Sequence, residues 1–163
     1  MRRDLNEKAY ANALAALSAP HQWVEQVLVG FAPNPPFTPR WPRLCMDLQW
    51  LGRPSLPLGA TPPPLVSPAE KLGALYVLEG SRLGAAAIAR VIARNLPDKV
   101  PTHFFSPASA DDQWALFWEF AAKRLDFHQV QGMVDGAVDT FGFFLAHLNA
   151  CDQAKGASES ETR

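Results

Sequence analysis

Two glycines in the middle of an apolar helical stretch are the residues of this chain best suited to chemistry. Gly80 and Gly84 are four residues apart, so they fall one turn apart on the same helix face. Each glycine inside a helix costs about 1 kcal/mol relative to alanine. A helix face without Cβ atoms lets a flat ligand lie against the backbone. Ser81, next to Gly80, is placed to orient an ordered water beside such a ligand.

The same spacing also has an ordinary structural explanation. Small residues four apart let a second helix approach closely, so that the two backbones pack together. The glycines alone therefore leave two alternatives open, a flat ligand or a neighbouring helix.

The helix that carries these glycines has clear ends in the sequence. Ser67 is a favourable N-cap, and Glu70 stands three residues later, where it completes a capping box. Pro97 marks the other end, because proline cannot continue a helix. We therefore predict one helix from Ser67 to about Asn95, bent where the two glycines fall.

The N-terminal half is also predicted to be helical, with long proline-rich connections. Apolar residues recur near helical spacing from about Asn6 to Val29, where Pro20 is expected to divide the segment in two. Eleven of the 15 prolines lie between positions 33 and 68, and they enclose one short predicted helix, Trp41 to Leu51.

Two more helices are predicted in the C-terminal half. One covers 113–125, and the other begins at the capping residue Asp126 and runs to about Ala150. No strand-like alternation is visible, so the fold class is predicted to be all-α. We expect a single helical domain over 1–152 and a disordered polar tail over 153–163.

Composition and charge exclude several function classes. With a formal net charge of −1 and a pI near 6.4, the chain lacks the basic excess typical of proteins that bind nucleic acid or membrane surfaces. Cys45 and Cys151 are 106 positions apart and have no Cys or His at metal-ligand spacing. These features predict a cytoplasmic protein with two reduced thiols and a small-molecule ligand.

The glycine-bearing segment resembles a known family. Residues 73–84, GALYVLEGSRLG, are similar to the distal-helix motif LYVLEGSxLG of the bacterial branch of the heme oxygenase family. Weaker similarities follow in the same order along the chain: Arg43-Leu44, Asp47-Leu48, Leu51-Gly52, His103-Phe104-Phe105, Trp114 with Phe117, and 137–141. The resemblance extends from about Val24 to Leu148 and implies a heme oxygenase-like helical bundle.

The resemblance also implies an activity and a set of site residues. The family opens heme, which is both substrate and cofactor, to biliverdin, carbon monoxide and iron, using dioxygen and an external electron donor. By this likeness Gly80, Ser81 and Gly84 would form the distal wall of the heme site. Lys123 and Arg124 fall near the cations that meet the heme propionates, and the aromatic residues that would line the pocket are Phe117, Phe120, Phe141 and Phe144. Solvated cations and core aromatics are the alternative explanations for these side chains.

The iron ligand of the family is not matched. Heme oxygenases hold iron through a proximal histidine on their first helix, in a pattern like LRxxTxxxH, which this chain does not contain. The simplest expectation is that the chain begins beyond that helix. A competing alignment makes His21 the axial ligand, but only 59 residues separate it from Gly80, and Pro20 directly before it favours a helix start.

Three functional hypotheses follow from the sequence. The first is a heme oxygenase-like enzyme that produces biliverdin. The second is a non-catalytic family member that binds a tetrapyrrole or a protein partner. The third is a helical interaction module in which a second copy of the chain, as a homodimer, fills the space of the missing helix.

Overall fold

The computed structural model describes residues 5–33, 36–97, 99–106 and 110–161. Within these residues the chain forms helices and no strands, so the predicted all-α fold class is confirmed. The elements in chain order are α1 (Glu7–Leu28), α2 (Trp41–Trp50), α3 (Pro68–Arg82), α4 (Ala85–Asn95), the 3₁₀-helix η1 (His103–Phe105), α5 (Ala110–Ala122), the 3₁₀-helix η2 (Phe127–Gln129) and α6 (Val130–Glu161).

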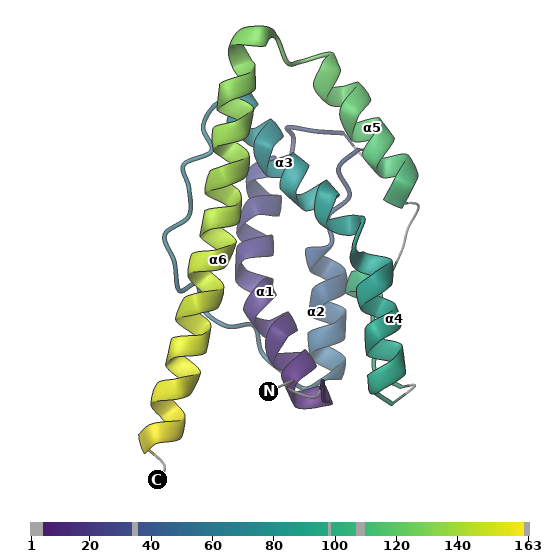
Figure 1. Ribbon diagram of the computed structural model, residues 1–163, viewed down its shortest axis with the longest axis vertical. Coiled ribbons are helices and arrows are strands. Elements are labelled where there is room, and N and C mark those ends of the chain that lie inside the picture. Colours follow the sequence, from purple (N-terminus) through teal and green to yellow (C-terminus); the bar gives the residue numbers. More distant parts are fainter. Residues whose placement is uncertain (1–4, 34–35, 98, 107–109, 162–163) are drawn as a thin grey trace.

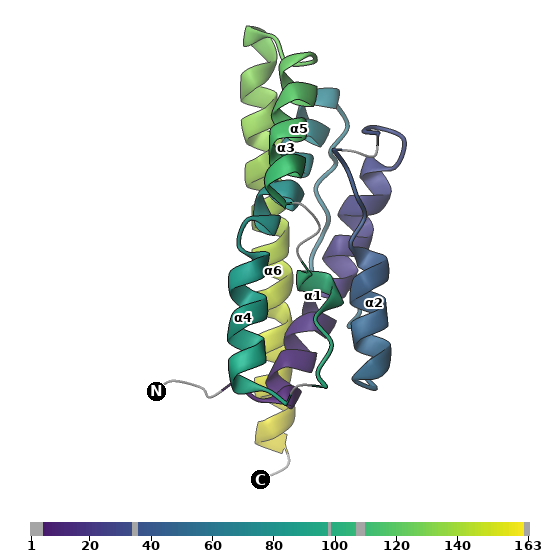
Figure 2. The same cartoon turned by 90° about the vertical axis from the view of Figure 1, so that its right-hand side faces the viewer.

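The helices pack as a bundle around α1 and α3. Figure 1 shows α6 as one long edge, with α3 running obliquely from its upper part toward α4. Figure 2 shows α2 on the opposite side of the bundle from α6 and α4. Helix α1 packs against α2, α6 and α3, while α5 covers α3. This arrangement places the C-terminal end of α3, which carries Gly80, in contact with both α4 and α5, and Gly84 at the start of α4.

Helix α1 is continuous through Pro20, so the predicted division of this segment is wrong. Proline removes one hydrogen bond from the helix, but the surrounding turns are held by burial. Leu14 and Val24 are completely buried on either side of the proline. The side chain of His21 supplies a further bond, from Nδ1 to the carbonyl oxygen of Leu17 at 2.9 Å. Tertiary packing therefore outweighs the local preference of proline to end a helix.

The capping box of α3 is present as predicted. The backbone N–H of Glu70 donates to Ser67 Oγ at 3.2 Å, and the backbone N–H of Ser67 donates to Glu70 Oε2 at 2.8 Å. The expected single bent helix is instead two helices. Helix α3 ends at Arg82, α4 begins at Ala85, and the two are inclined by 41°.

The last helix is longer than predicted. Helix α6 runs to Glu161, so the tail that was expected to be disordered from 153 is helical through that residue, and 162–163 lie outside the described residues. Alanine, glutamine, lysine and glutamate in this segment favour helix even without tertiary contacts. The domain boundary at 152 stays a prediction.

Helices α3 and α6 cross with their backbones almost in contact. A Cβ atom added to Gly73 would lie 2.1 Å from the carbonyl oxygen of Met133, and one added to Gly136 would lie 2.2 Å from the carbonyl oxygen of Glu70. No side chain fits at either position, because the obstacle is rigid backbone. Close helix packing, one of the two explanations considered for Gly80 and Gly84, therefore applies to a different pair of glycines.

None of the helices described is, by itself, both apolar and long enough to span a membrane. Only the bent pair α3 and α4, taken together, reaches that length and hydropathy. Most of α3 is buried inside the bundle, which explains its apolar composition.

We predict that Gly73→Ala and Gly136→Ala each destabilise the fold by about 2 to 3 kcal/mol, because the two helices must move apart. The measurement is urea unfolding followed by circular dichroism. Gly142→Ala is the matched control on α6, since its Cβ would meet nothing within 4 Å. It should be neutral or stabilise by up to about 1 kcal/mol. Equal effects at the three positions would contradict the packing argument.

Candidate functional site

Gly80 and Gly84 lie at the C-terminal end of α3 and the start of α4, and the fold itself does not require either glycine. A Cβ on Gly80 would sit 3.5 Å from the indole ring of Trp114, an ordinary van der Waals contact. A Cβ on Gly84 would meet only the carbonyl oxygen of Ser81, at 3.9 Å. Gly84 has a φ of −85°, which any residue adopts, and Gly80 is not among the positive-φ residues.

An aromatic cluster stands beside Gly80. The ring of Trp114 stacks on Phe117 with centroids 5.3 Å apart, and Tyr76 and Trp118 pack against it at 5.4 and 5.6 Å. Phe117 is completely buried, which makes it a core residue, whereas Trp118 is largely exposed. The end of α3 is therefore flanked on the α5 side by a wall of flat, apolar rings.

The hydroxyl of Ser81 is engaged by the protein. Its Oγ donates to the carbonyl oxygen of Leu78 at 2.7 Å and accepts a hydrogen bond from Arg40. One acceptor lone pair remains on this oxygen. Ser81 is exposed, so a water can still reach that lone pair, which was the role predicted for it.

Beneath the end of α3 lies a buried cluster of four charged side chains. Glu79 and Arg82 form an ion pair with 2.6 Å between Nε and Oε2, and Arg82 also donates to the carbonyl oxygen of Thr38. Arg40 donates to the carbonyl oxygen of Leu78 at 3.1 Å. These contacts tie the loop between α1 and α2 to the underside of α3.

Glu25 completes this cluster by capping α2. Its carboxylate accepts from the backbone N–H of Arg40 at 2.9 Å and from that of Trp41 at 3.0 Å. Burial raises the pKa values of Glu25 and Glu79, although their hydrogen bonds and the nearby arginines act in the opposite direction. Burial lowers the pKa of Arg40 to about 10, so this arginine is still charged at neutral pH.

His21 is a core residue in this fold. It is 5% exposed, and its ring makes edge contacts with Phe104 and Phe144 at centroid distances of 5.0 and 4.9 Å. Burial, with a further contribution from Arg40, lowers its pKa to about 3. Because the carbonyl of Leu17 can only accept, Nδ1 carries the proton and Nε2 has the lone pair. The enclosing rings separate that lone pair from any ligand on the surface.

The predicted propionate cations are not brought to the glycines. Lys123 and Arg124 are exposed just beyond the end of α5, and Arg124 lies 3.8 Å from the ring centroid of Phe120. Trp114 adjoins Gly80, and Lys123 is nine residues farther along, which is about 13 Å of helix. Figure 1 shows that the C-terminal end of α5 is the end farther from α4.

The predicted pocket aromatics divide into two groups. Phe120 is buried in the core, and Phe144 is half-buried against His21. Phe141 differs, because 58% of it is exposed on α6. Only Phe141 among them is therefore available to a ligand at the surface.

His147 also serves the fold. Its Nδ1 accepts from the backbone N–H of Gly59 at 3.0 Å, so Nε2 carries the proton and faces Cys151 Sγ at 3.5 Å. In the part of the chain that the structure describes, no three His, Cys, Asp or Glu side chains are placed to hold a metal ion. Neither Cys45 nor Cys151 forms a disulfide within the described residues.

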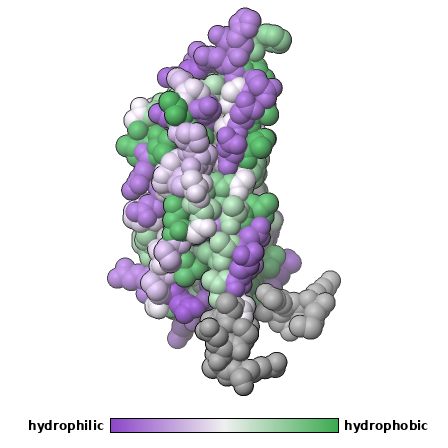
Figure 3. All heavy atoms as spheres, turned by 90° about the vertical axis from the view of Figure 1, so that its left-hand side faces the viewer, coloured by the Kyte–Doolittle hydropathy of each residue, from purple (hydrophilic) through white to green (hydrophobic). Residues whose placement is uncertain are grey.

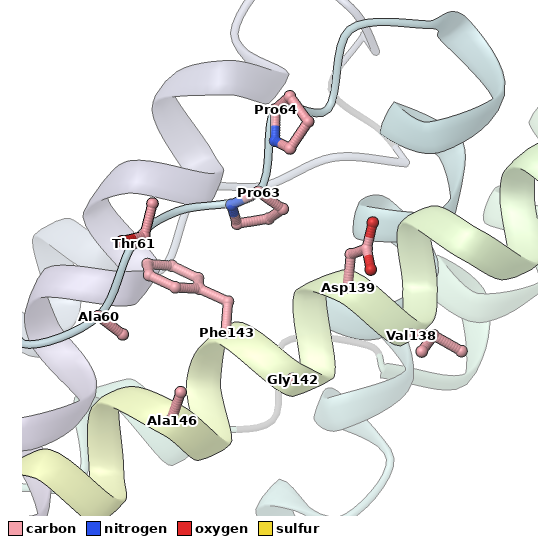
Figure 4. A pocket seen from close by; sticks show the side chains of 9 residues that line it. All are labelled: Ala60, Thr61, Pro63, Pro64, Val138, Asp139, Gly142, Phe143 and Ala146. Atoms are coloured by element: carbon pink, nitrogen blue, oxygen red, sulfur yellow. The ribbon is translucent and has the colours of Figure 1, made fainter.

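A shallow groove lies on the other side of α6, against the proline-rich connection. It has a volume of about 570 Å³ and is lined by Ala60, Thr61, Pro63, Pro64, Val138, Asp139, Gly142, Phe143 and Ala146. Figure 4 shows Phe143 and Asp139 pointing from α6 toward this connection. Figure 3 shows this side of the molecule, where hydrophobic and weakly polar residues fill the middle of the face. Its lining has no cation to pair with an acidic ligand. Gly80 and Gly84 are not part of the lining.

The chain has clear relatives, although no protein-family model matches it. A curated heme oxygenase from Xanthomonas campestris pv. campestris (strain 8004) is 35% identical over 114 residues, which are 69% of this chain and 66% of that relative. The chain belongs to the heme oxygenase family. A solved structure of the NO- and CO-bound heme oxygenase from Neisseria meningitidis is similar in fold, with a TM-score of 0.71, 21% identity, and coverage of 89% of this chain and 77% of that one.

Family motifs alone did not identify the buried charges. Arg40 stands among prolines with no pattern that marks it as buried, and Glu25 is a charged residue, a type that is mostly exposed. Glu79 and Arg82 lie inside the heme oxygenase motif, which is the one signal that pointed to this cluster. Their partners come from segments some 40 to 55 residues away, so only the folded chain brings them together.

The buried neutral state of His21 predicts a pH dependence of stability. Because its folded pKa lies below the unfolded value, its contribution is complete above about pH 6.5 and is lost as the pH falls toward 3. Between pH 7 and 4.5 this loss amounts to roughly 2 to 3 kcal/mol. We expect His21→Phe, which keeps an aromatic ring there, to show a correspondingly smaller loss. Urea unfolding at the two pH values measures it.

Burial raises the pKa values of Glu25 and Glu79, and raised carboxyl pKa values change stability with pH in the opposite direction. They are present in both proteins, so the difference between wild type and His21→Phe isolates the histidine. An identical pH dependence in the two proteins would show that His21 is not held neutral.

Proposed function

We propose that this heme oxygenase-like chain binds heme on the face formed by Gly80 and Gly84. The observation that carries the proposal is that a Cβ atom would fit at both positions, so close packing in the fold explains neither glycine. Gly80 lies inside α3, where it costs about 1 kcal/mol relative to alanine, and Gly84 is the N-cap of α4 with a φ that any residue adopts. Gly73 and Gly136, by contrast, are required by the crossing of α3 and α6. A flat ligand against the bare backbone supplies the missing reason.

The surface next to Gly84 supports an apolar ligand. Gly84, Ile88 and Val91 are spaced four and three apart, so they share one face of α4. Ile88 and Val91 are 43% and 49% exposed, and Leu83 at the helix break is 49% exposed. Exposed apolar side chains that follow one another in this way are typical of a binding surface. We propose that they contact the porphyrin together with Phe141 of α6.

We propose that the reaction is that of the family, the opening of heme to biliverdin, carbon monoxide and iron with dioxygen and an external electron donor. Bound heme supplies both the iron and the ring that is opened. In this chain Gly80 and Gly84 admit the ring to the backbone, and the remaining lone pair of Ser81 Oγ accepts from a water beside it. Lys123 and Arg124, exposed just beyond the end of α5, are proposed as partners of the propionates, which extend from the edge of the porphyrin.

A second candidate function is a tetrapyrrole-binding protein without turnover. The burial of His21 favours it, because the alignment that made this residue the axial ligand needs its Nε2 at the surface. Without an imidazole on iron, the electronic push that supports oxygen chemistry is lost. A hemin titration followed by addition of a reductant in air distinguishes the enzyme from the binding protein. The enzyme would release biliverdin, whereas the binding protein would keep an unchanged heme spectrum.

The remaining partners and the location are also proposals. The family activity needs an electron-donor protein, and a second copy of the chain is a candidate to cover the exposed apolar residues of α6. Sedimentation of the purified chain tests the homodimer. A cytoplasmic location is proposed because neither Cys45 nor Cys151 forms a disulfide among the described residues, which suits a reducing compartment.

We predict that Gly84→Leu abolishes hemin binding while leaving the fold intact. The side chain enters open space in the ligand-free protein, so the fold should stay intact, with at most a small drop in melting temperature from the loss of a glycine N-cap. In the complex it would project into the space of the porphyrin. Optical titration with hemin and thermal unfolding by circular dichroism measure the two effects.

Gly142→Leu is the matched control, because Gly142 is an exposed helical glycine on the groove side of α6 with nothing within 4 Å of its Cβ position. It should bind hemin like wild type. Unchanged hemin affinity in Gly84→Leu would remove the glycine face from the site.

A further inference from the structure

The bend between α3 and α4 is not caused by an unusual backbone conformation. Leu83 and Gly84 at the junction have φ, ψ angles of −58°, −31° and −85°, −12°, which both lie in the right-handed helical region. Instead, two backbone hydrogen bonds at the junction span three residues rather than four. Leu83 N–H donates to the carbonyl oxygen of Gly80, three residues back, at 3.2 Å, and Ala87 N–H likewise to Gly84 at 3.1 Å. Such a junction can continue as straight helix unless something holds it bent.

The side chain of Arg40, from the loop before α2, hydrogen-bonds to α3 just before the bend. Arg40 Nη2 donates both to the carbonyl oxygen of Leu78 and to Ser81 Oγ. Ser81 Oγ in turn donates to the same carbonyl of Leu78 at 2.7 Å. Side chains that donate hydrogen bonds to the backbone carbonyls of a helix often bend it. Here Arg40 and Ser81 both donate to the carbonyl oxygen of Leu78, in the turn directly before the break.

Arg40 is itself rigidly placed. It is 4% exposed, and its backbone N–H is bound by the carboxylate of Glu25. Its guanidinium lies 5.0 Å from the ring centroid of Phe104. The planar fork of arginine can hold two acceptors in a fixed geometry, which the single ammonium of lysine cannot. Arg40 is therefore held in place by contacts with α1 and η1 and by its position at the start of α2.

We infer that Arg40 is a positioning residue that sets the bend between α3 and α4 and thereby holds Gly80 and Gly84 in the arrangement that receives the ligand. It acts through Leu78 and Ser81 and touches no ligand itself. The part of this inference that concerns heme rests on the proposed function, whereas the part that concerns the bend does not.

The bend is tested without any ligand. A crystal structure of Arg40→Met should show the angle between α3 and α4 well below 41°. Methionine fills a similar apolar volume but cannot donate. An unchanged angle would overturn the inference, because the bend would then have another cause.

The ligand part is tested by hemin titration of Arg40→Met, Arg40→Lys and Arg43→Met. We expect Arg40→Met to weaken hemin binding at least tenfold and to change the Soret spectrum, with Arg40→Lys intermediate. Arg43 is the matched control. It lies one turn along α2 and is close enough to influence the pKa of Arg40, but no hydrogen bond joins it to α3 in the part of the chain described. Its variant should bind like wild type.

The outcomes separate the two proposals. If wild type does not bind hemin, the proposed function fails, and the crystallographic angle still decides the role of Arg40. If wild type and Arg40→Met bind with the same affinity and spectrum, the inference fails while the proposed function stands. Should Arg40→Met not fold, the cycle of Arg40→Lys, Ser81→Ala and their combination replaces it. Additive effects on hemin affinity in that cycle would overturn the coupling of Arg40 to Ser81.

Discussion

The structure depends on one contact, the crossing of α3 and α6 at Gly73 and Gly136. At these positions the two backbones are so close that even a methyl group has no room. The crossing therefore fixes the height and direction of α3 against the longest helix of the bundle. Everything farther along α3, including the break at its end and the helix that follows, takes its place from this point. Gly80 lies seven residues beyond this crossing on α3, so its position in the bundle follows from it.

The opposite end of α3 is held by charge rather than by close packing. Two carboxylates, Glu25 and Glu79, and two guanidinium groups, Arg40 and Arg82, are buried together beneath it. Buried ion pairs add little net stability, because removing charges from water costs about as much as their attraction returns. Their directional hydrogen bonds do specify one arrangement of the loop between α1 and α2 against the helix. This is the property needed where a bend has to be held at a defined place.

The glycines of the chain illustrate how residues of one type differ in what surrounds them. Gly73 and Gly80 are seven apart on the same helix, and both are half-buried or buried. A side chain at Gly73 would collide with the backbone of α6, whereas a Cβ at Gly80 would fit. The distinction does not follow from spacing. It depends on which second element faces each residue, and α6 faces one while the ring of Trp114 on α5 faces the other.

Local chemistry in the sequence was sufficient for the capping box of Ser67 and Glu70, for the all-α class and for the family motif, because each depends on residues a few positions apart. The tertiary structure alone decided three matters. Helix α1 runs through Pro20, since burial on both sides outweighs the missing bond. His21, considered as a ligand, is enclosed by rings from η1 and α6. Arg40 reaches Leu78 and Ser81 across some 40 positions of sequence. Contacts between distant segments leave no periodic or spacing signal in a single chain, so only the folded molecule reveals them.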